Sequence, residues 1–388
     1  MSGVRQRTVF YVAGFDARGV PHYHPLYRDQ AALQSAMAGP PIEVSDPQLL
    51  SNHLTSWTVT RGETQTTYIF CNWGDIVRPF FKNSPARMWW NTLTATVRFV
   101  ATGALGKSIR WSWPFALTIS LPILLLVLFP VLGLAAIVSG FAIGSSAAIA
   151  LGSLVGLALL WLSRRWTKRF HVTWLARALP FFVRDEAGTI PGLDTRLDLF
   201  ADAVARAMDN AANDEVLLVG HSYGTPLAVK IAERALRRAD GTRLSLLTLG
   251  QVVPLLAWLP RASAMREALR TVSHSRRVDW IDFSAPADGA CYAFVDPLTA
   301  LGEDAGDRTN PKLLNAKFHE TMPADRYAKA KRDWQALHFQ YILAGIAPGS
   351  YDYFAITAGD RTLADRFAGR ASVRDFTRLR IGATKDMR

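Results

Sequence analysis

Residues 215–232, EVLLVGHSYGTPLAVKIA, form the stretch that decides the fold. It begins with four apolar residues, 216–219, which are typical of a buried strand in a parallel sheet. A Gly-x-Ser-x-Gly motif follows at 220–224, and the residues after it have an apolar face that predicts a helix. A strand, a sharp turn and a helix in this order would raise the hydroxyl of Ser222 above the edge of the sheet, where it can act as a nucleophile.

The two glycines of this motif have a steric purpose. A Cβ atom at Gly220 or Gly224 would collide with the adjacent strand or helix. The helix that follows the serine has free N–H groups and a partial positive charge at its N-terminus, which favour a developing oxyanion. The stretch resembles the nucleophile elbow of the α/β-hydrolase superfamily, in its serine esterase and lipase branch. The resemblance covers the chain on either side of a large insertion.

Apolar runs alternate with amphipathic segments along the rest of the chain. Such an alternation implies a mostly parallel sheet with helices on both faces, which is an α/β fold, and the resemblance implies one of α/β-hydrolase type. The strands are predicted at 8–13, 54–60, 66–71, 244–249 and 278–283.

The positive charge of the chain is confined to one segment. The formal net charge is +12, yet residues 76–184 contain no Asp or Glu and hold twelve Lys and Arg residues. The remainder has 32 basic and 32 acidic residues and is neutral. Nucleic acid is one partner that such a charge could bind, but the apolar residues inside the segment favour a membrane, and we expect no nucleic-acid binding.

Residues 111–163 are 53 residues without a charged side chain or a histidine. One membrane span needs about 20 residues, so this length fits two spans with a tight turn. We predict spans near 114–134 and 140–162, with the turn at 133–140. A buried helical pair in a soluble core would need a surrounding protein layer that a domain of this size lacks.

Basic and aromatic residues flank both ends of this apolar stretch. The positive-inside rule therefore keeps both flanks, and the hydrolase domain, on the cytoplasmic side. Residues 85–100 and 165–182 mix Trp and Phe with Arg and Lys, which predicts two interfacial helices against anionic lipid headgroups. The N-terminus predicts a first strand and no signal peptide, and two cysteines indicate a reducing compartment.

Three regions follow from these features. Residues 1–79 are expected to form the N-terminal part of the hydrolase domain. Residues 80–191 would be the membrane insertion, with the transmembrane hairpin at about 114–162. Residues 192–388 would complete the hydrolase domain. Because the neutral remainder holds all the candidate catalytic residues, we expect the insertion to be separable from it.

A serine nucleophile needs a base and an acid that orients the base. The resemblance implies the chain order serine, acid, histidine. Asp288 lies just past the strand at 278–283 and is the favoured acid. Asp296 and Asp282 are the alternatives, and an Asx turn at 287–289 would explain Asp288 without catalysis.

Two histidines follow the acid in the chain. His338 lies between a polar helix and a short apolar segment, late in the sequence, where the resemblance implies the base. His319 is the alternative base. His221, inside the motif, is expected to pack beneath the serine.

The oxyanion would be bound by backbone amides. The resemblance implies one from the residue after the nucleophile, Tyr223, and one from a loop after an early strand, for which Phe15 is the candidate. The His-Gly-Gly-Gly motif of lipases is absent. His22 and His24 have no further ligands nearby, so we expect neither a metal nor a cofactor.

These features predict a membrane-anchored serine hydrolase that cleaves a small or lipid ester through an acyl-enzyme. Two alternatives stay open. The fold could be a non-catalytic membrane scaffold or binding module, or the same three residues could serve an acyltransferase or thioesterase. The sequence indicates no protein partner.

Overall fold

The computed structural model describes residues 3–37, 39–240, 243–303, 306, 308–345, 347 and 349–373. A nine-stranded sheet lies at its centre, in the order β2-β4-β5-β1-β6-β7-β8-β9, with β3 paired to β4. The strands β5, β1, β6, β7, β8 and β9 are parallel to their neighbours in this series, whereas β2, β3 and β4 form an antiparallel edge. The predicted α/β class with a mostly parallel sheet is therefore confirmed. The strands are β1 (Gln6–Val12), β2 (Ile42–Val44), β3 (Gln48–Ser51), β4 (Leu54–Arg61), β5 (Thr64–Cys71), β6 (Glu215–His221), β7 (Leu244–Leu249), β8 (Val278–Ser284) and β9 (Lys312–Asn315).

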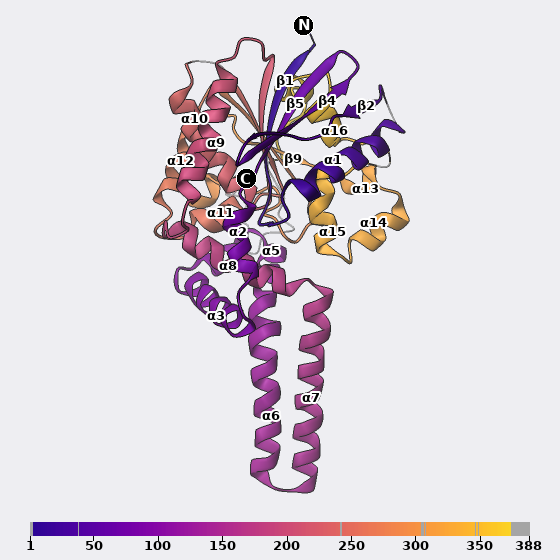
Figure 1. Ribbon diagram of the computed structural model, residues 1–388. Coiled ribbons are helices and arrows are strands. Elements are labelled where there is room, and N and C mark those ends of the chain that lie inside the picture. The colour runs from indigo at the N-terminus through magenta and orange to yellow at the C-terminus, as the bar shows by residue number, and fades with distance from the viewer. Residues whose placement is uncertain are drawn as a thin grey trace.

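Helices cover both faces of the sheet (Figure 1). Side chains alternate along β1, so that Phe10 and Val12 enter one core while Val9 and Tyr11 enter the other. The first core is closed by α9 (Leu193–Met208), α10 (Gly224–Arg238) and α12 (Ser263–His274). The second core is closed by α1 (Val20–Ser35), α16 (Tyr353–Ala358) and α17 (Leu363–Arg366).

The remaining helices lie at the carboxyl edge of the sheet or beyond it (Figure 1). These helices are α2 (Gly74–Phe81), α3 (Pro85–Ala101), α4 (Ala104–Trp111), α5 (Trp113–Pro122), α6 (Phe129–Ile143), α7 (Ser146–Arg169), α8 (Val172–Glu186), α11 (Val253–Ala257), α13 (Phe318–Thr321), α14 (Ala324–Ala330) and α15 (Trp334–Phe339). A π-helical turn at Ile123–Leu128 joins α5 to α6. It lies between Pro122 and Pro130, which have no backbone N–H to donate to the regular helical hydrogen bonds.

Two long apolar helices project from the rest of the molecule (Figure 1). The stretches Trp113–Ile143 and Ser146–Arg169 are long and apolar enough to cross a membrane, and only 17% and 11% of their most apolar windows are buried. Helices that formed the core of a soluble domain would be mostly buried. We call α6, α7 and the turn between them the helical hairpin.

The hairpin turn lies later in the chain than the predicted 133–140. Gly144 ends α6 in a left-handed conformation (φ 79°), and the Ser145 side chain caps α7 by accepting from the Ala148 amide. Gly133 and Gly140 instead lie inside α6, where they let α7 approach. A Cβ atom on Gly140 would lie 2.6 Å from the Ala148 carbonyl oxygen. The small residues therefore pack the hairpin against itself.

Much of the predicted insertion belongs to the core. Leu179, Phe181 and Phe182 of α8 and Phe115 of α5 are buried in the same cluster as α9 and α10. The packing therefore does not favour our expectation that all of residues 80–191 can be separated from the rest of the chain. The part that projects is the hairpin.

Candidate active site

The motif at 220–224 forms a tight turn between β6 and α10. Ser222 has a left-handed backbone (φ 55°), which is a strained conformation for a side chain other than glycine. Added Cβ atoms would lie 2.6 Å from the Gly224 carbonyl oxygen at Gly220, and 2.1 Å from the Val12 carbonyl oxygen at Gly224. The turn is thus in close contact with β1 and with α10, and only glycine fits at positions 220 and 224.

Asp288 and His338 form a buried pair at the same edge of the sheet. His338 Nδ1 lies 2.8 Å from Asp288 Oδ2, and the two side chains are 2% and 0% exposed. Asp288 lies in the loop after β8, and His338 lies in α15. A carboxylate only accepts, so Nδ1 donates, and in a neutral imidazole Nε2 would then carry the free lone pair.

Gly250 connects this pair to the serine. Its backbone is left-handed (φ 56°), and a Cβ atom there would lie 3.1 Å from His338 Cε1 and 3.3 Å from Asp288 Oδ2. The preceding residue, Leu249, accepts the Ser222 amide at 2.9 Å. Ser222, Asp288 and His338 therefore gather at the carboxyl ends of β6, β7 and β8. Among the described residues, Ser222 Oγ makes no direct hydrogen bond to His338.

The Asp288 carboxylate is held in its charged form. Burial alone would raise its pKa, but His338 together with the Ala290 amide and the Cys291 thiol outweighs burial and lowers the pKa below its usual value. The Ala290 amide donates to Asp288 Oδ1 at 2.9 Å, which is an Asx turn. Asp288 can therefore be both the residue of an Asx turn and the partner of the base. Its Oδ1 accepts from the Ala290 amide, and its Oδ2 accepts from the His338 imidazole.

The other candidate acids and bases lie elsewhere. Asp296 pairs with Arg308 at 2.8 Å, and Asp282 accepts from the Thr248 hydroxyl at 2.7 Å. His319 is exposed on α13 beside Tyr327, with ring centroids 6.0 Å apart. The structure therefore brings His338, and not His319, to Asp288.

The two candidate oxyanion amides flank the serine. A Cβ atom on Gly14 would lie 3.3 Å from Ser222 Oγ, so the loop that carries Phe15 passes directly beside the hydroxyl. Within the described part of the chain, the amides of Phe15 and Tyr223 donate to no other group. The indole N–H of Trp174 donates to the Phe15 carbonyl at 3.1 Å and fixes this loop. Two unengaged amides beside one hydroxyl are what an oxyanion hole requires.

His221 is buried and contacts the backbone of the candidate base. Its Nε2 lies 2.8 Å from the His338 carbonyl oxygen, and the two rings are 5.1 Å apart. Burial, and then the neighbouring His338, lower the pKa of His221 to about 3. It is therefore a neutral donor that holds the backbone of α15.

The sequence did not reveal Gly250, Trp174 or the backbone role of His221. A glycine directly after the predicted strand at 244–249 was the available signal for Gly250. Trp174 had no such signal, because its contact with Phe15 spans 159 residues.

A metal centre is not evident in the described ranges, where no group of three or more His, Cys, Asp or Glu side chains is arranged to hold an ion. His24 Nε2 instead lies 2.9 Å from the Ser45 carbonyl oxygen.

The buried Asp282 predicts a pH-dependent stability. Burial raises its pKa from 3.8 to about 7, because the hydrogen bonds to its side chain only partly offset the loss of water. A raised folded-state pKa contributes stability that is complete below about pH 4 and is lost as the pH rises through 7. The unfolding free energy of Asp282→Asn minus that of the wild type should therefore rise by about 4 kcal/mol when the pH is raised from 4 to 8. Unfolding free energies at both pH values test this, and a constant difference would contradict it.

Comparisons with protein-family models, with curated proteins and with solved structures found no match to this chain. Any function proposed for it therefore depends on the geometry of its own residues.

Proposed function

We propose that this chain is a serine hydrolase of the α/β-hydrolase type that cleaves an ester through an acyl-enzyme. The observation that carries the proposal is the buried 2.8 Å contact between His338 Nδ1 and Asp288 Oδ2 next to the strained turn at Ser222. A strained nucleophile turn and an oriented imidazole at the end of a parallel sheet are the parts that acyl transfer requires.

The reaction follows from these positions. Ser222 Oγ attacks the ester carbonyl carbon while His338 Nε2 removes the hydroxyl proton. Asp288 keeps the other ring nitrogen protonated and stabilises the imidazolium. The amides of Phe15 and Tyr223 donate to the oxyanion. When the tetrahedral intermediate collapses, the imidazolium gives its proton to the leaving alcohol. His338 Nε2 then removes a proton from a water molecule as its oxygen attacks the acyl carbon, and the imidazolium returns that proton to Ser222 Oγ as the acid product leaves.

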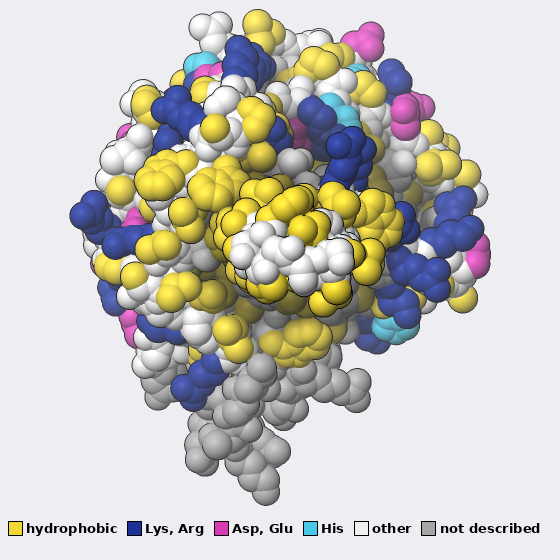
Figure 2. Space-filling view, turned by 90° about the horizontal axis from the view of Figure 1, so that it is seen from below, with side chains coloured by type: hydrophobic (Ala, Val, Ile, Leu, Met, Phe, Trp, Pro, Cys, Tyr) yellow, Lys and Arg dark blue, Asp and Glu magenta, His cyan; other side chains and the backbone are white. Residues whose placement is uncertain are grey.

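The placement of the site favours a lipid ester as the substrate. The carboxyl edge of the sheet, where Ser222 lies, faces the projecting hairpin (Figure 1). Seen from below, the hairpin is surrounded by hydrophobic side chains with Lys and Arg near the margin (Figure 2). Exposed aromatic and aliphatic residues also lie on α3, among them Trp90 and Val97. An anionic membrane is the partner that such a surface fits.

A fluorophosphonate probe tests the proposed activity. It reacts with an activated serine, so intact protein should be labelled at Ser222, and Ser222→Ala should not be labelled. Assays with ester, thioester and amide substrates then show which bond is cleaved, and product analysis with an added acceptor alcohol separates hydrolysis from acyl transfer. Absence of labelling would favour the non-catalytic scaffold.

We further propose that the hairpin spans the membrane with the sheet on the cytoplasmic side. Lys107 and Arg110 precede the first apolar helix, and Arg164 and Lys168 end the second, so both flanks are basic. A reporter fused at the C-terminus should therefore behave as cytoplasmic. A reporter that is active only on the opposite side of the membrane would reverse this orientation.

Removal of the hairpin alone is expected to give a soluble, active protein. Ser163 Oγ donates to the Leu125 carbonyl at 2.5 Å, so a short Gly/Ser linker can replace residues 126–162, which hold all of α6 and most of α7 and leave only the basic end of α7 in place. The truncated protein should turn over a small water-soluble ester at a rate of the same order as the full chain, and it should lose activity on ester substrates embedded in vesicles. Centrifugation and ester assays measure both outcomes.

The matched control is a deletion of all of residues 80–191. It removes Phe181 and Phe182, which are buried in the hydrophobic core, and the buried Asp185, and it should therefore aggregate. If the hairpin deletion also aggregates, or folds without activity on any ester, the hairpin is part of the core or of the site.

A further inference from the structure

A buried ion pair connects α8 to the nucleophile turn. Lys230 Nζ lies 2.7 Å from Asp185 Oδ1, and the hydroxyl of Tyr223 donates to Asp185 Oδ2 at 2.7 Å. Asp185 is near the end of α8, whereas Tyr223 and Lys230 belong to the turn and to α10. The Asp185 and Lys230 side chains are 4% and 10% exposed. Charges removed from water to this extent persist only when they are paired.

Tyr223 occupies a sensitive position. It follows Ser222 directly, and its amide is one of the two that would bind the oxyanion. Its ring is packed edge-on against Phe181 and Phe182 of α8, with centroids 4.9 and 4.6 Å away. Burial, and then the adjacent Asp185, raise the pKa of Tyr223 well above its usual value, so the phenol stays neutral and donates. Both the ring and the hydroxyl of Tyr223 are therefore held by α8.

We propose that Asp185 is a positioning residue for the nucleophile turn, because its hydrogen bond to the Tyr223 hydroxyl fixes the direction of the Tyr223 amide. Lys230 compensates the buried carboxylate and lets Asp185 accept this bond as an anion, which makes the bond stronger than a neutral one. This inference rests on the proposed hydrolase function.

The inserted segment therefore contacts the candidate active site through α8. The helix α8 begins three residues after α7 ends, so the hairpin and Asp185 belong to one continuous stretch of chain. Trp174, also on α8, holds the Phe15 carbonyl, so the same helix contacts the residues that carry both candidate oxyanion amides. The helix that follows the hairpin thereby becomes part of the support of the oxyanion hole.

The decisive variant is Tyr223→Phe, which removes one hydroxyl and leaves both the backbone amide and the Asp185–Lys230 pair in place. With a small soluble ester and the full-length protein, we expect kcat to fall by about 10- to 100-fold with little change in KM, since a misdirected oxyanion donor acts only in the transition state. The rate of fluorophosphonate labelling should fall in parallel. Asp185→Asn should likewise lower kcat with little change in KM. The variant with both substitutions should lower kcat little more than either single substitution does.

Glu186→Gln is the matched control. Glu186 is the next residue of α8, is also buried, and pairs with Arg98 at 2.7 Å and with the Arg261 amide, away from the turn. It should lower the melting temperature without changing kcat. If Tyr223→Phe keeps the wild-type kcat and labelling rate, the positioning role is wrong, even if Asp185→Asn fails to fold. If the wild type is itself not labelled, the hydrolase function fails instead.

Discussion

Replacement of Ser222 by alanine is expected to reduce turnover of a small ester by about 10⁶-fold, the largest effect of any single substitution in this chain. In the proposed mechanism, the hydroxyl oxygen is the atom that bonds to the carbonyl carbon, so its removal leaves the site without a nucleophile. The Phe15 and Tyr223 amides would remain, so a small residual rate above the uncatalysed reaction should persist. Steady-state kinetics with an activated ester, together with melting curves that show an intact fold, measure the loss.

The two histidines provide a matched comparison. His338→Ala should cost nearly as much as Ser222→Ala, and the double variant should cost little more, because in the proposed mechanism the two residues act as one unit. His319→Ala removes an exposed imidazole away from Asp288 and should keep the wild-type rate. The assignment would be reversed if His319→Ala abolished turnover while His338→Ala retained it.

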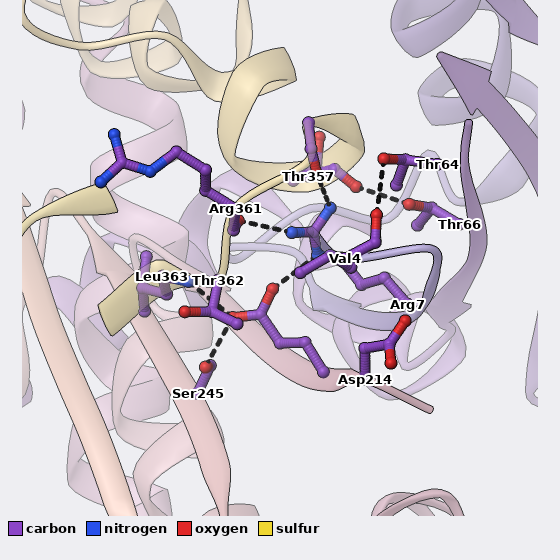
Figure 3. A network of polar contacts seen from close by, with 12 residues as sticks. Val4, Arg7, Thr64, Thr66, Asp214, Ser245, Thr357, Arg361, Thr362 and Leu363 are labelled. Atoms are coloured by element: carbon purple, nitrogen blue, oxygen red, sulfur yellow. Dashed lines mark hydrogen bonds and ion pairs between the residues drawn. The ribbon is translucent and has the colours of Figure 1, made fainter. Parts of the chain in front are cut away.

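Replacement of Arg7 by methionine is expected to lower the free energy of unfolding by about 3–5 kcal/mol. Arg7 is a fully buried side chain at the opposite end of the sheet from Ser222, and Figure 3 shows it within a polar network. Its Nε donates to Glu215 Oε2 at 2.6 Å, and its two terminal nitrogens donate to the carbonyls of Gly359 and Arg361 at 2.7 Å. Methionine would leave a buried carboxylate and two carbonyl groups without these donors.

The loss should be large because Glu215 connects three parts of the chain. Its other oxygen, Oε1, accepts from the Ser245 hydroxyl at 2.7 Å and from the Leu363 amide at 2.6 Å. The network therefore joins β1, β6 and β7 to the segment that contains α16 and α17. Chemical unfolding in detergent, followed by tryptophan fluorescence, would measure the change.

Arg243→Met is the control for the same chemical change at the surface. Arg243 pairs with Asp279 at 2.5 Å, but its side chain is 62% exposed, so water replaces the interaction and the cost should stay below about 1 kcal/mol. Equal effects of the two substitutions would show that the buried network does not stabilise the fold in the way proposed.

Local patterns in the sequence were sufficient for several features of this protein. Apolar runs separated by amphipathic segments predicted the α/β class and most of the central strands. This was possible because a buried strand consists of consecutive apolar residues. The strand, turn and helix around Ser222 were predictable since all three lie within residues 215–232. The long uncharged stretch likewise indicated two apolar helices. The membership in a hydrolase family and the crossing of a membrane stay predictions.

Other features required the folded chain, because they depend on residues that are distant in sequence. The pairing of Asp288 with His338 spans 50 residues, and the sequence alone kept His319 as an alternative. The predicted position of the hairpin turn was wrong because glycines such as Gly133 and Gly140 are typical of turns. In the structure these two glycines instead allow α6 and α7 to approach closely.

The limits of the insertion also depended on tertiary contacts. The basic and aromatic composition of residues 80–191 indicated a membrane segment, but it did not reveal that Phe181 and Asp185 face the core. Asp185 meets Tyr223 and Lys230 across 38 and 45 residues, and Arg7 meets Glu215 across 208. Sequence therefore determined which segments are apolar, helical or sharply turned, whereas only the tertiary structure decided which charges are buried together, since a buried charge is stable only beside the partner that the fold brings to it.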